Sequence, residues 1–187
     1  MTENRTYLRA LELSDLKKLN QWHNDDNIYP HITGNKYFIS SARDEKWLKD
    51  ILKNDSSSFH LAICYKETDE MIGYTSFLDV DYLNSKAIIG GFTLDRVFQR
   101  RHFGTDAFLQ YMNFAFNEMG LNRLVTAYLE NNIVTARHMK IHGFKIESIL
   151  REEVYKLGKF HNVVVVSLLA SEYKEKEKHD LDNPHVK

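Results

Sequence analysis

The chain has 187 residues, with 25 lysines and arginines, 26 acidic residues and a formal net charge of −1. This length fits one domain with a substantial core, and the balanced charge gives no reason to expect nucleic acid as the main partner. No segment approaches the roughly 20 consecutive apolar residues of a membrane span, so we expect no membrane partner.

The chain contains a single cysteine, Cys64, within the apolar run 59–65. It cannot form an internal disulfide, which is typical of a protein in a reducing compartment. No base stands beside it in the sequence, so we expect a small core residue rather than a nucleophile. The opening Met-Thr-Glu-Asn-Arg lacks the apolar core of a signal peptide, and we therefore expect a cytoplasmic protein.

The first third of the chain predicts one strand and two helices. Residues 7–11 suit a short strand, and Ser14 then offers an N-cap to a helix. Turn-forming residues over 25–34 predict a loop. A second helix is expected after Ser41, with Asp44 completing a capping-box pattern.

The middle of the chain predicts three strands. Two of them, residues 59–65 and 71–78, lie on either side of a polar turn of hairpin length. Residues 87–94 are mostly apolar with β-branched members, which predicts a buried strand. Gly90 and Gly91 inside it indicate a bulge or the close approach of another backbone.

A basic loop over residues 99–104 follows this strand and leads into an amphipathic helix that runs from Thr105 to Gly120. Free amide N–H groups and the helix dipole make such a terminus favourable for an anion. Arg100 and Arg101 add formal positive charge. The loop alone leaves open the alternative of a solvated basic turn before an ordinary helix.

The last third predicts strands over residues 123–129, 146–155 and 162–169, and a helix over 134–142 that Gly143 closes. The elements together predict a mixed α/β domain of about seven strands and four helices.

The end of the chain has a different composition. Residues after Glu172 are nearly all charged or polar, which predicts a frayed helical end or a disordered tail. We therefore expect one domain over residues 1–173 and a flexible, charged tail over residues 174–187.

Four segments resemble the GNAT superfamily of N-acetyltransferases. Its acetyl-CoA-binding motif is similar to Gly91-Phe-Thr-Leu-Asp followed by Gln99-x-x-x-x-Gly104-Thr-Asp-Ala. Its next signature resembles Asn132-x-x-Thr135-Ala with Gly143-Phe144 after it. Segments 8–24 and 151–173 are similar to the group around ribosomal-protein N-terminal acetyltransferases and spermidine acetyltransferases. The resemblance implies the GNAT fold, in which the fourth and fifth strands of a mixed sheet splay apart.

The resemblance also implies acetyl-CoA as co-substrate. In the family, the strand ahead of the loop pairs with the pantetheine arm, and the loop amides bind the pyrophosphate. The implied cofactor-binding residues are Phe92, Thr93 and Leu94 on the strand, Gln99, Arg100, Arg101, His102, Phe103, Gly104 and Thr105 in the loop, and Asn132.

Three positions depart from the family pattern. His102 stands where the motif has its first glycine, and its imidazole can contact a phosphate or lie in solvent. Ile89 replaces a glutamate that acts as base in many relatives, and Met139 replaces a tyrosine that acts as general acid. The base and the acid must therefore come from other residues or from ordered water.

Amine acetylation needs a neutral amine, a stabilised oxyanion and a proton for the departing thiolate. The resemblance implies Asn132 near pantetheine or a catalytic water, and Thr135 as a hydroxyl near the thiolate. Each has an alternative, because Asn132 suits a turn and Thr135 could cap the following helix. His31 or His23 could act as the base, since imidazole titrates near neutral pH, and both could equally be surface loop residues.

The expected acceptor is a primary amine of a peptide N-terminus, a polyamine or another small molecule, attacking directly in a ternary complex. Asp25 and Asp26, with Asp79 and Asp81, could present negative charge to a polyamine or could be solvated loop ends. No metal site is predicted, and a homodimer is compatible with the family. The departures from the pattern motivate one alternative, an acyl-CoA-binding module with little or no transferase activity.

Overall fold

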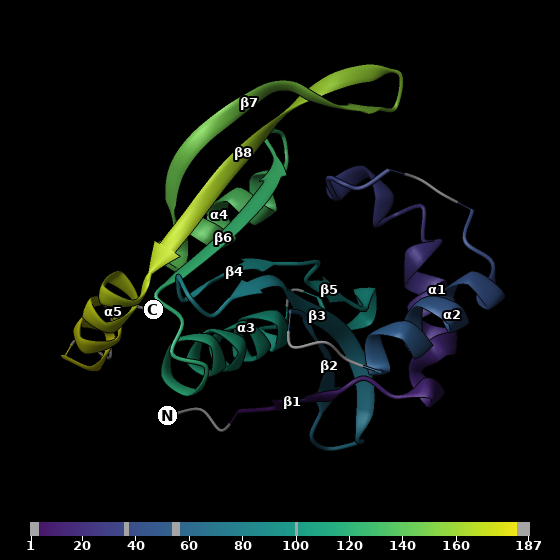
Figure 1. Ribbon diagram of the computed structural model, residues 1–187, viewed down its shortest axis with the longest axis horizontal. Helices are drawn as coiled ribbons and strands as arrows, with labels where there is room; N and C mark the ends of the chain where they lie inside the picture. The colour runs from purple at the N-terminus through teal and green to yellow at the C-terminus, as the bar shows by residue number, and fades with distance from the viewer. Residues whose placement is uncertain (1–3, 36–37, 54–56, 100, 183–187) are drawn as a thin grey trace.

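The computed structural model describes residues 4–35, 38–53, 57–99 and 101–182. These residues form one eight-stranded mixed sheet flanked by helices, as the predicted α/β class requires (Figure 1). The strands run in the order β1, β2, β3, β4, β6, β8, β7, and β5 pairs with β3 outside this path. Their bounds are β1 (Thr6–Ala10), β2 (Phe59–Tyr65), β3 (Glu70–Asp81), β4 (Lys86–Ile89), β5 (Thr93–Leu94), β6 (Arg123–Leu129), β7 (Lys145–Lys156) and β8 (Lys159–Leu169).

Five α-helices connect or follow these strands in the described part of the chain. They are α1 (Leu16–His23), α2 (Ser41–Leu52), α3 (Phe103–Asn113), α4 (Ile133–Ile141) and α5 (Ala170–Asp182). A π-helix over Phe114–Glu118 extends α3, and 3-10 turns cover Leu13–Asp15, Tyr29–His31 and Arg96–Phe98.

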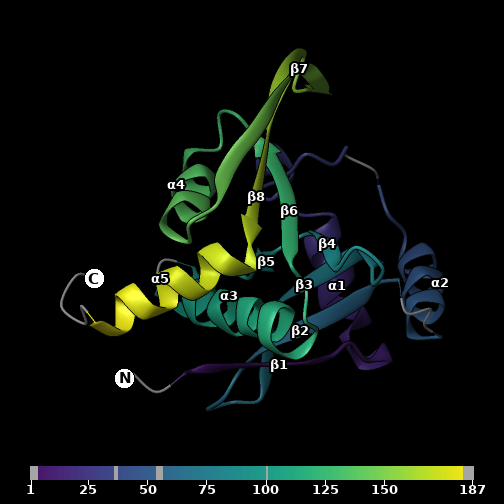
Figure 2. The same ribbon diagram turned by 60° about the vertical axis from the view of Figure 1, so that its left-hand side comes forward.

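Helices cover both faces of the sheet formed by β1, β2 and β3. α1 and α2 pack on one face through an apolar cluster that includes Leu19, Trp22 and Leu48. α3 contributes Phe108 and Tyr111 to the main core on the other face. Both ribbon views place α3 across the sheet from α1 and α2 (Figures 1 and 2).

Two predicted helix caps are wrong. Ser14 lies inside the 3-10 turn that precedes α1, so it does not cap that helix. Ser40 rather than Ser41 caps α2, with its hydroxyl accepting a bond from the first turn. Asp44 therefore takes no part in a capping box with Ser41, and its carboxylate turns toward His23 of α1 instead.

The single strand predicted over residues 87–94 is two strands, because β4 ends at Ile89 and β5 joins β3. The close backbone approach predicted from the glycines is confirmed at Gly90. Its amide donates to the Ser76 carbonyl at 2.8 Å, and a Cβ added at Gly90 would lie 2.0 Å from Ser76 Oγ. A side chain at this position would displace the Ser76 hydroxyl and press on Leu78, 3.2 Å away.

The C-terminal part of the chain follows the predicted order. Gly143 and Gly158 adopt φ values of 87° and 81°, as a helix end and a turn require. The segment after β8 is helical, and Tyr173 of α5 stacks on Phe116 with ring centroids 4.9 Å apart. Cys64 is fully buried, as predicted. None of the helices in the described residues is long and apolar enough to cross a membrane.

The replacement Gly90→Ala should destabilise the fold, because its methyl group would overlap the Ser76 hydroxyl. We expect a loss on the order of 1–3 kcal/mol in the free energy of unfolding, measured by urea denaturation. Gly91→Ala is the matched control, since a Cβ there meets only the Tyr74 hydroxyl at 4.0 Å. Equal stability of the two variants would contradict the proposed steric role of Gly90.

Candidate active site

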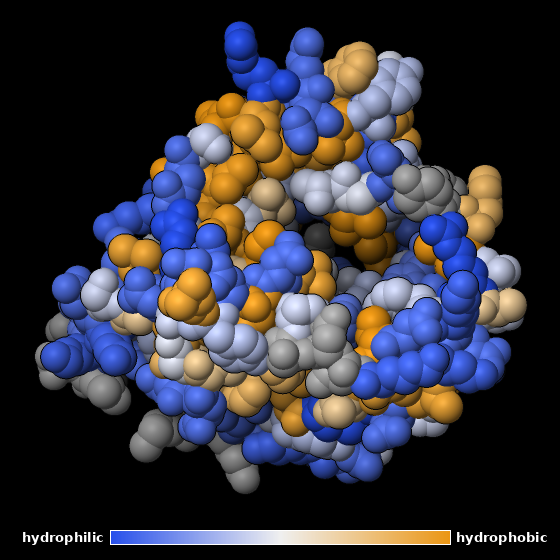
Figure 3. All heavy atoms as spheres, viewed as in Figure 1, coloured by the Kyte–Doolittle hydropathy of each residue, from blue (hydrophilic) through white to orange (hydrophobic). Residues whose placement is uncertain are grey.

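The sheet opens between β5 and β6. β4 pairs in parallel with the start of β6. After Ile89 the chain stays beside β3, where Thr93 pairs with Tyr74, but leaves β6, which continues to Leu129 beside β8. This is the predicted splay, because β4 and β5 together form the predicted fourth strand and β6 is the predicted fifth. Figure 3, seen from the same side as Figure 1, shows a hollow near the centre of the molecule, between β5 and the hairpin of β7 and β8.

The loop after β5 folds back onto that strand. Asp95 Oδ1 accepts a bond from the Val97 amide at 3.1 Å, which holds the short 3-10 turn. Gln99 Nε2 donates to the Leu94 carbonyl at 2.8 Å. The Gln99 side chain thus fixes the shape of the loop, and direct contact with a cofactor stays a prediction. Arg100 lies outside the described residues.

α3 begins at a residue with left-handed backbone geometry. His102 is the N-cap, with φ of 65° and ψ of 0°, and its side chain is exposed. Glycine adopts this geometry freely and histidine tolerates it better than most residues, which explains how His102 replaces a glycine. No side chain caps α3 among the described residues. The first-turn amides, including that of Thr105, can therefore receive an anion.

The residues around this terminus offer different groups. Arg101 is exposed, whereas the Phe103 ring is buried beneath the Arg5 guanidinium, 4.1 Å from its centroid. Arg5 also donates to the Arg101 carbonyl and pairs with Asp106 at 3.6 Å. This pairing offsets the one acidic side chain in the first turn of α3. The site can thus offer the backbone of Phe103 and Gly104 and the charge of Arg101 to a phosphate.

The predicted pantetheine segment uses its side chains for packing. Phe92 meets Phe108 edge to face, with centroids 5.5 Å apart. Leu94 lies against α3, where its Cδ2 atom would be 3.7 Å from a Cβ on Gly104. The backbone edge of Phe92 and Thr93 that does not face β3 is therefore the part available to an extended ligand, since the Leu94 carbonyl already accepts a bond from Gln99.

The three predicted catalytic residues lie together. Asn132 Oδ1 accepts a bond from the Thr135 amide at 3.0 Å, so Asn132 rather than Thr135 caps α4. Asn132 Nδ2 donates to the His31 carbonyl at 2.9 Å. Both bonds are structural, and the imidazole of His31 is exposed. Catalytic roles for these three residues stay predictions.

Lys156, which the sequence analysis missed, holds the loop after α1. Its ammonium donates to the carbonyls of Tyr29, Ile32 and Gly34 at 2.6–2.7 Å, and only 1% of the residue is exposed. The burial lowers the pKa of the Lys156 ammonium. Together with the bond from Asn132, it ties the loop to the far side of the sheet opening. No local sequence signal marks this contact, because more than a hundred residues separate Lys156 from the carbonyls that it binds.

His23 occupies the inner side of the α1–α2 layer. Its Nδ1 atom lies 2.9 Å from Asp44 Oδ1 and its Nε2 atom 3.2 Å from the Tyr74 hydroxyl. Asn20 Nδ2 donates to the second carboxylate oxygen of Asp44 at 2.7 Å. Of the two candidate histidines, His23 is the one bonded to groups that can exchange or orient a proton.

The two positions that usually supply acid and base are part of the core. Ile89 is 5% exposed and Met139 is 6% exposed. Neither side chain can transfer a proton, so the departures from the family pattern are built into the packing of β4 and α4.

The four acidic residues considered for the acceptor lie in two places. Asp25, in the loop after α1, accepts bonds from the backbone and side chain of Asn27, and the backbone bond is the main cause of its lowered pKa. Asp26 adjoins it and is exposed. Asp81 is held in the β3–β4 turn by Asn84, at 2.7 Å. Asp25 and Asp26 alone belong to the loop that Lys156 anchors.

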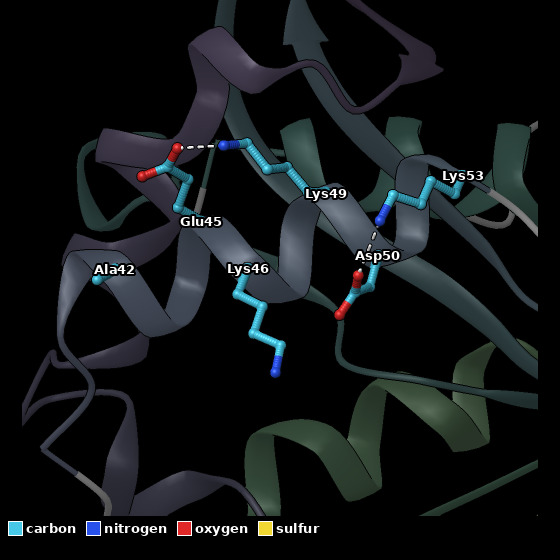
Figure 4. Close-up of a pocket in the computed structure, with 6 residues that line it drawn as sticks. All are labelled: Ala42, Glu45, Lys46, Lys49, Asp50 and Lys53. Carbon is cyan, nitrogen blue, oxygen red and sulfur yellow. Dashed lines mark hydrogen bonds and ion pairs between the residues drawn. The ribbon is translucent and has the colours of Figure 1, made fainter.

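A shallow depression of about 450 Å³ runs along α2 (Figure 4). Two exposed ion pairs, Lys49–Glu45 and Lys53–Asp50, lie among its lining residues. The depression is therefore the solvated face of a single helix. It contains none of the predicted site residues. Its lining residues are Ala42, Glu45, Lys46, Lys49, Asp50 and Lys53. Within the described ranges, no group of three or more His, Cys, Asp or Glu residues is placed to hold a metal ion.

Known proteins share this sequence pattern and fold. Residues 5–145 match the family described as acetyltransferase (GNAT) domain. The chain is 28% identical to the uncharacterized N-acetyltransferase p20 of Bacillus licheniformis, over 90% of this chain and 95% of that protein. It is 20% identical to the uncharacterized N-acetyltransferase YnaD of Bacillus subtilis, over 92% and 98%. The fold is similar to that of spermidine N-acetyltransferase from Vibrio cholerae in complex with CoA and spermine, with a TM-score of 0.84, 20% identity, and coverage of 91% of this chain and 98% of that one.

The replacement Gly104→Phe should abolish acetyl-CoA binding, because a bulky side chain in the first turn of α3 would occupy the space beside the amides that we expect to hold the pyrophosphate. A Cβ at Gly104 makes only ordinary contact with Leu94, at 3.7 Å, so the backbone itself leaves room for substitution. We expect a loss of affinity of at least about tenfold, or about 1.4 kcal/mol, measured by calorimetry. His102→Gly is the control, because it keeps the left-handed geometry and should retain binding. Unchanged affinity of Gly104→Phe would contradict this placement of the pyrophosphate.

The replacement Lys156→Met should release the loop after α1, because three carbonyls would lose their shared donor. We expect a loss on the order of 2–4 kcal/mol in the free energy of unfolding, measured by urea denaturation. The KM for the acceptor should rise more than the KM for acetyl-CoA. Lys159→Met, at an exposed lysine of the same hairpin, should change stability by less than about 0.5 kcal/mol. A stable Lys156→Met protein with an unchanged acceptor KM would refute the anchoring role.

Proposed function

From the premise that this chain belongs to the GNAT acetyltransferase family and is an acetyl-CoA-dependent N-acetyltransferase, we propose that its acceptor is a primary amine of a small polycation such as a polyamine. The observation that carries the proposal is the opening between β5 and β6, which the uncapped terminus of α3 and the α1–α2 layer both border. One border suits an anion and the other suits a cationic amine.

The α3 border supports a role for the loop 99–105 in holding the pyrophosphate of acetyl-CoA. Its first-turn amides, with the charge of Arg101, complement phosphate oxygens. The edge of β5 supports pairing with the pantetheine amides, which would bring the thioester toward the side where Tyr74 lies. Bound in this way, acetyl-CoA supplies the acetyl group as an activated thioester.

The acceptor border supports a cation. Asp25 and Asp26 lie in the loop held by Lys156, and hydrogen bonds from Asn27 hold the pKa of Asp25 below its usual range. Two adjacent carboxylates favour an extended polyamine, which carries several positive charges, over a neutral amine. The fold shared with the Vibrio cholerae enzyme, whose complex contains spermine, is a further reason to place polyamines first.

Direct transfer in a ternary complex suits this arrangement. Cys64 is fully buried, and burial raises the pKa of its thiol, so it is a poor candidate for a covalent intermediate. The amine nitrogen then forms the new C–N bond as the C–S bond breaks, and the thiolate takes up a proton. Asn132 and Thr135 remain our candidates beside the thioester, and His31 remains a candidate at the entrance of the site. The free thiol of Cys64 also supports a cytoplasmic setting.

The proposal predicts acetyl transfer to spermidine and spermine in preference to other amines. Purified full-length chain would be incubated with acetyl-CoA and polyamines, peptides with free N-termini or aminoglycosides, with thiol release and product mass as readouts. We expect monoacetylated polyamine, and initial-rate plots that intersect as a ternary-complex mechanism requires. If only a peptide is acetylated, the acceptor is a peptide N-terminus and the polyamine proposal is wrong. If no amine is acetylated, the proposed function is refuted.

Variants of the acidic residues distinguish a specific polyamine site from non-specific electrostatic attraction of the polyamine to the protein. Replacing Asp25 and Asp26 together by Asn should raise the KM for spermidine on the order of fivefold, or about 1 kcal/mol. Asp81→Asn is the control, because that carboxylate lies in the β3–β4 turn and not in the loop that Lys156 anchors. An equal KM for both variants would rule out recognition by the loop after α1.

A further inference from the structure

We propose that Tyr74, His23 and Asp44 form the route by which the acceptor ammonium loses its proton. Tyr74 is the catalytic residue that touches the amine, and His23 and Asp44 are positioning residues that act through it. This inference rests on the proposed function, because it assigns the base of the same reaction.

Tyr74 lies where the sheet opens. It pairs with Thr93 across β3 and β5, and its hydroxyl would be 4.0 Å from a Cβ on the exposed Gly91. Gly91 lies in the middle of the backbone segment that joins β4 to β5. The hydroxyl therefore reaches the segment along which pantetheine is proposed to lie, on the side covered by α1 and α2.

A bulge in β3 determines this direction. Ile63 pairs with Gly73 while Cys64 pairs with Met71, which leaves Ile72 as an extra residue on β3. Side chains alternate across a strand, so one inserted residue reverses the faces beyond it. Ile72 packs toward α3, and Tyr74 packs among residues of α1 and α2. Without the bulge, the hydroxyl would point away from His23.

The two contacts of His23 fix its tautomer. An ionised carboxylate only accepts hydrogen bonds, so the neutral imidazole donates from Nδ1 to Asp44 Oδ1 at 2.9 Å. Nε2 is then left to accept from the Tyr74 hydroxyl, 3.2 Å away. Asn20 holds the other oxygen of Asp44 and restricts rotation of the carboxylate. The phenol, the imidazole and the carboxylate thus point along one line of proton transfer.

The burial of these groups argues for a use beyond stability. Asp44 is 3% exposed, and the His23 side chain is 18% exposed. A buried charged pair adds little stability compared with apolar side chains of similar size. Aromatic rings surround the pair, with Trp22 stacked on Tyr74 and Trp47 edge-on to His23. This wall limits water access, so a proton on the imidazole is stabilised by Asp44 rather than by solvent.

Other titratable groups around His23 do not compete for this role. His23 faces Asp44 of α2 and Tyr74 of β3. His60 of β2 contacts Trp47, with the two ring centroids 5.6 Å apart, so the indole lies between the two histidines. Burial lowers the pKa of His60, so it stays neutral. Burial, with the charge of Asp44, raises the pKa of the Tyr74 hydroxyl, while a hydrogen bond from Thr93 lowers it. Tyr74 therefore remains a phenol and passes a proton on rather than keeping it.

The proton balance is complete. The ammonium of the acceptor gives a proton to the Tyr74 oxygen while the phenol proton moves to His23 Nε2, leaving a neutral amine and an imidazolium beside Asp44. The amine then forms the C–N bond and the C–S bond breaks; one of the two amine protons goes to the departing sulfur and the other stays on the amide nitrogen. His23 returns its proton to solvent. The products are the acetylated amine, CoA thiol and one proton.

The test is the pH dependence of kcat/KM for spermidine between pH 6.5 and 9.5, for the wild type, Tyr74→Phe and His23→Gln. The wild type can use the ammonium form, so we expect a nearly level profile over most of this range. The variants can use only amine that is already neutral. Their deficit should therefore shrink about tenfold for each pH unit toward the pKa of the amine. A merely structural role would lower the rate by the same factor at every pH.

Two further measurements keep the outcomes distinct. His60→Gln disturbs the same aromatic wall without touching Tyr74, and we expect its profile to follow the wild type. Acetyl-CoA affinity of the two relay variants should equal that of the wild type, which shows that they are folded. An active wild type with variants of unchanged or parallel profile overturns the relay alone. A wild type that acetylates no amine overturns the proposed function and the relay with it.

Discussion

The close approach of Gly90 to Ser76 is the constraint on which the site depends. It allows the chain to bond to β3 as β4 ends, so that β5 continues on β3 while β6 continues on β8. The sheet opens because β5 and β6 are bound to different neighbours, β3 and β8. Gly73 completes the constraint, since a Cβ there would lie 2.3 Å from the Thr93 carbonyl.

The opening is maintained by long-range polar contacts on either side. Arg5, from the start of β1, closes the loop before α3 and offsets Asp106. Lys156 and Asn132 hold the loop after α1 from the opposite half of the sheet. Of these donors Lys156 is the buried one, so breaking its contacts would leave three carbonyls without hydrogen bonds. The geometry of the site therefore follows from the completed fold rather than from any one segment.

The sequence could predict the strands, the helix after Gly104 and the glycine at the close approach, because each rests on local periodicity or on backbone freedom. It could not predict the bulge at Ile72, because the pattern of apolar and polar residues in β3 is compatible with a regular strand and with a bulged one. The role of Asp44 was misread because a carboxylate three residues after a serine also fits a capping box. Lys156 was missed because nothing near it in the sequence distinguishes a buried lysine from an exposed one.

The arrangement separates two electrostatic tasks across one sheet. In the proposed complex, phosphate lies against positive groups at α3, on the face opposite Asp44, while the amine lies beside the negative charge of the α1–α2 layer. If both tasks shared a face, the carboxylate would repel the phosphates or pair with the arginines of the loop. With the sheet between them, Asp44 can stabilise an imidazolium at His23 without weakening the anion site. The proposed relay would thus compensate for the absence of a base at Ile89 on the acceptor side, where the proton originates, and the cofactor side would need no titratable residue.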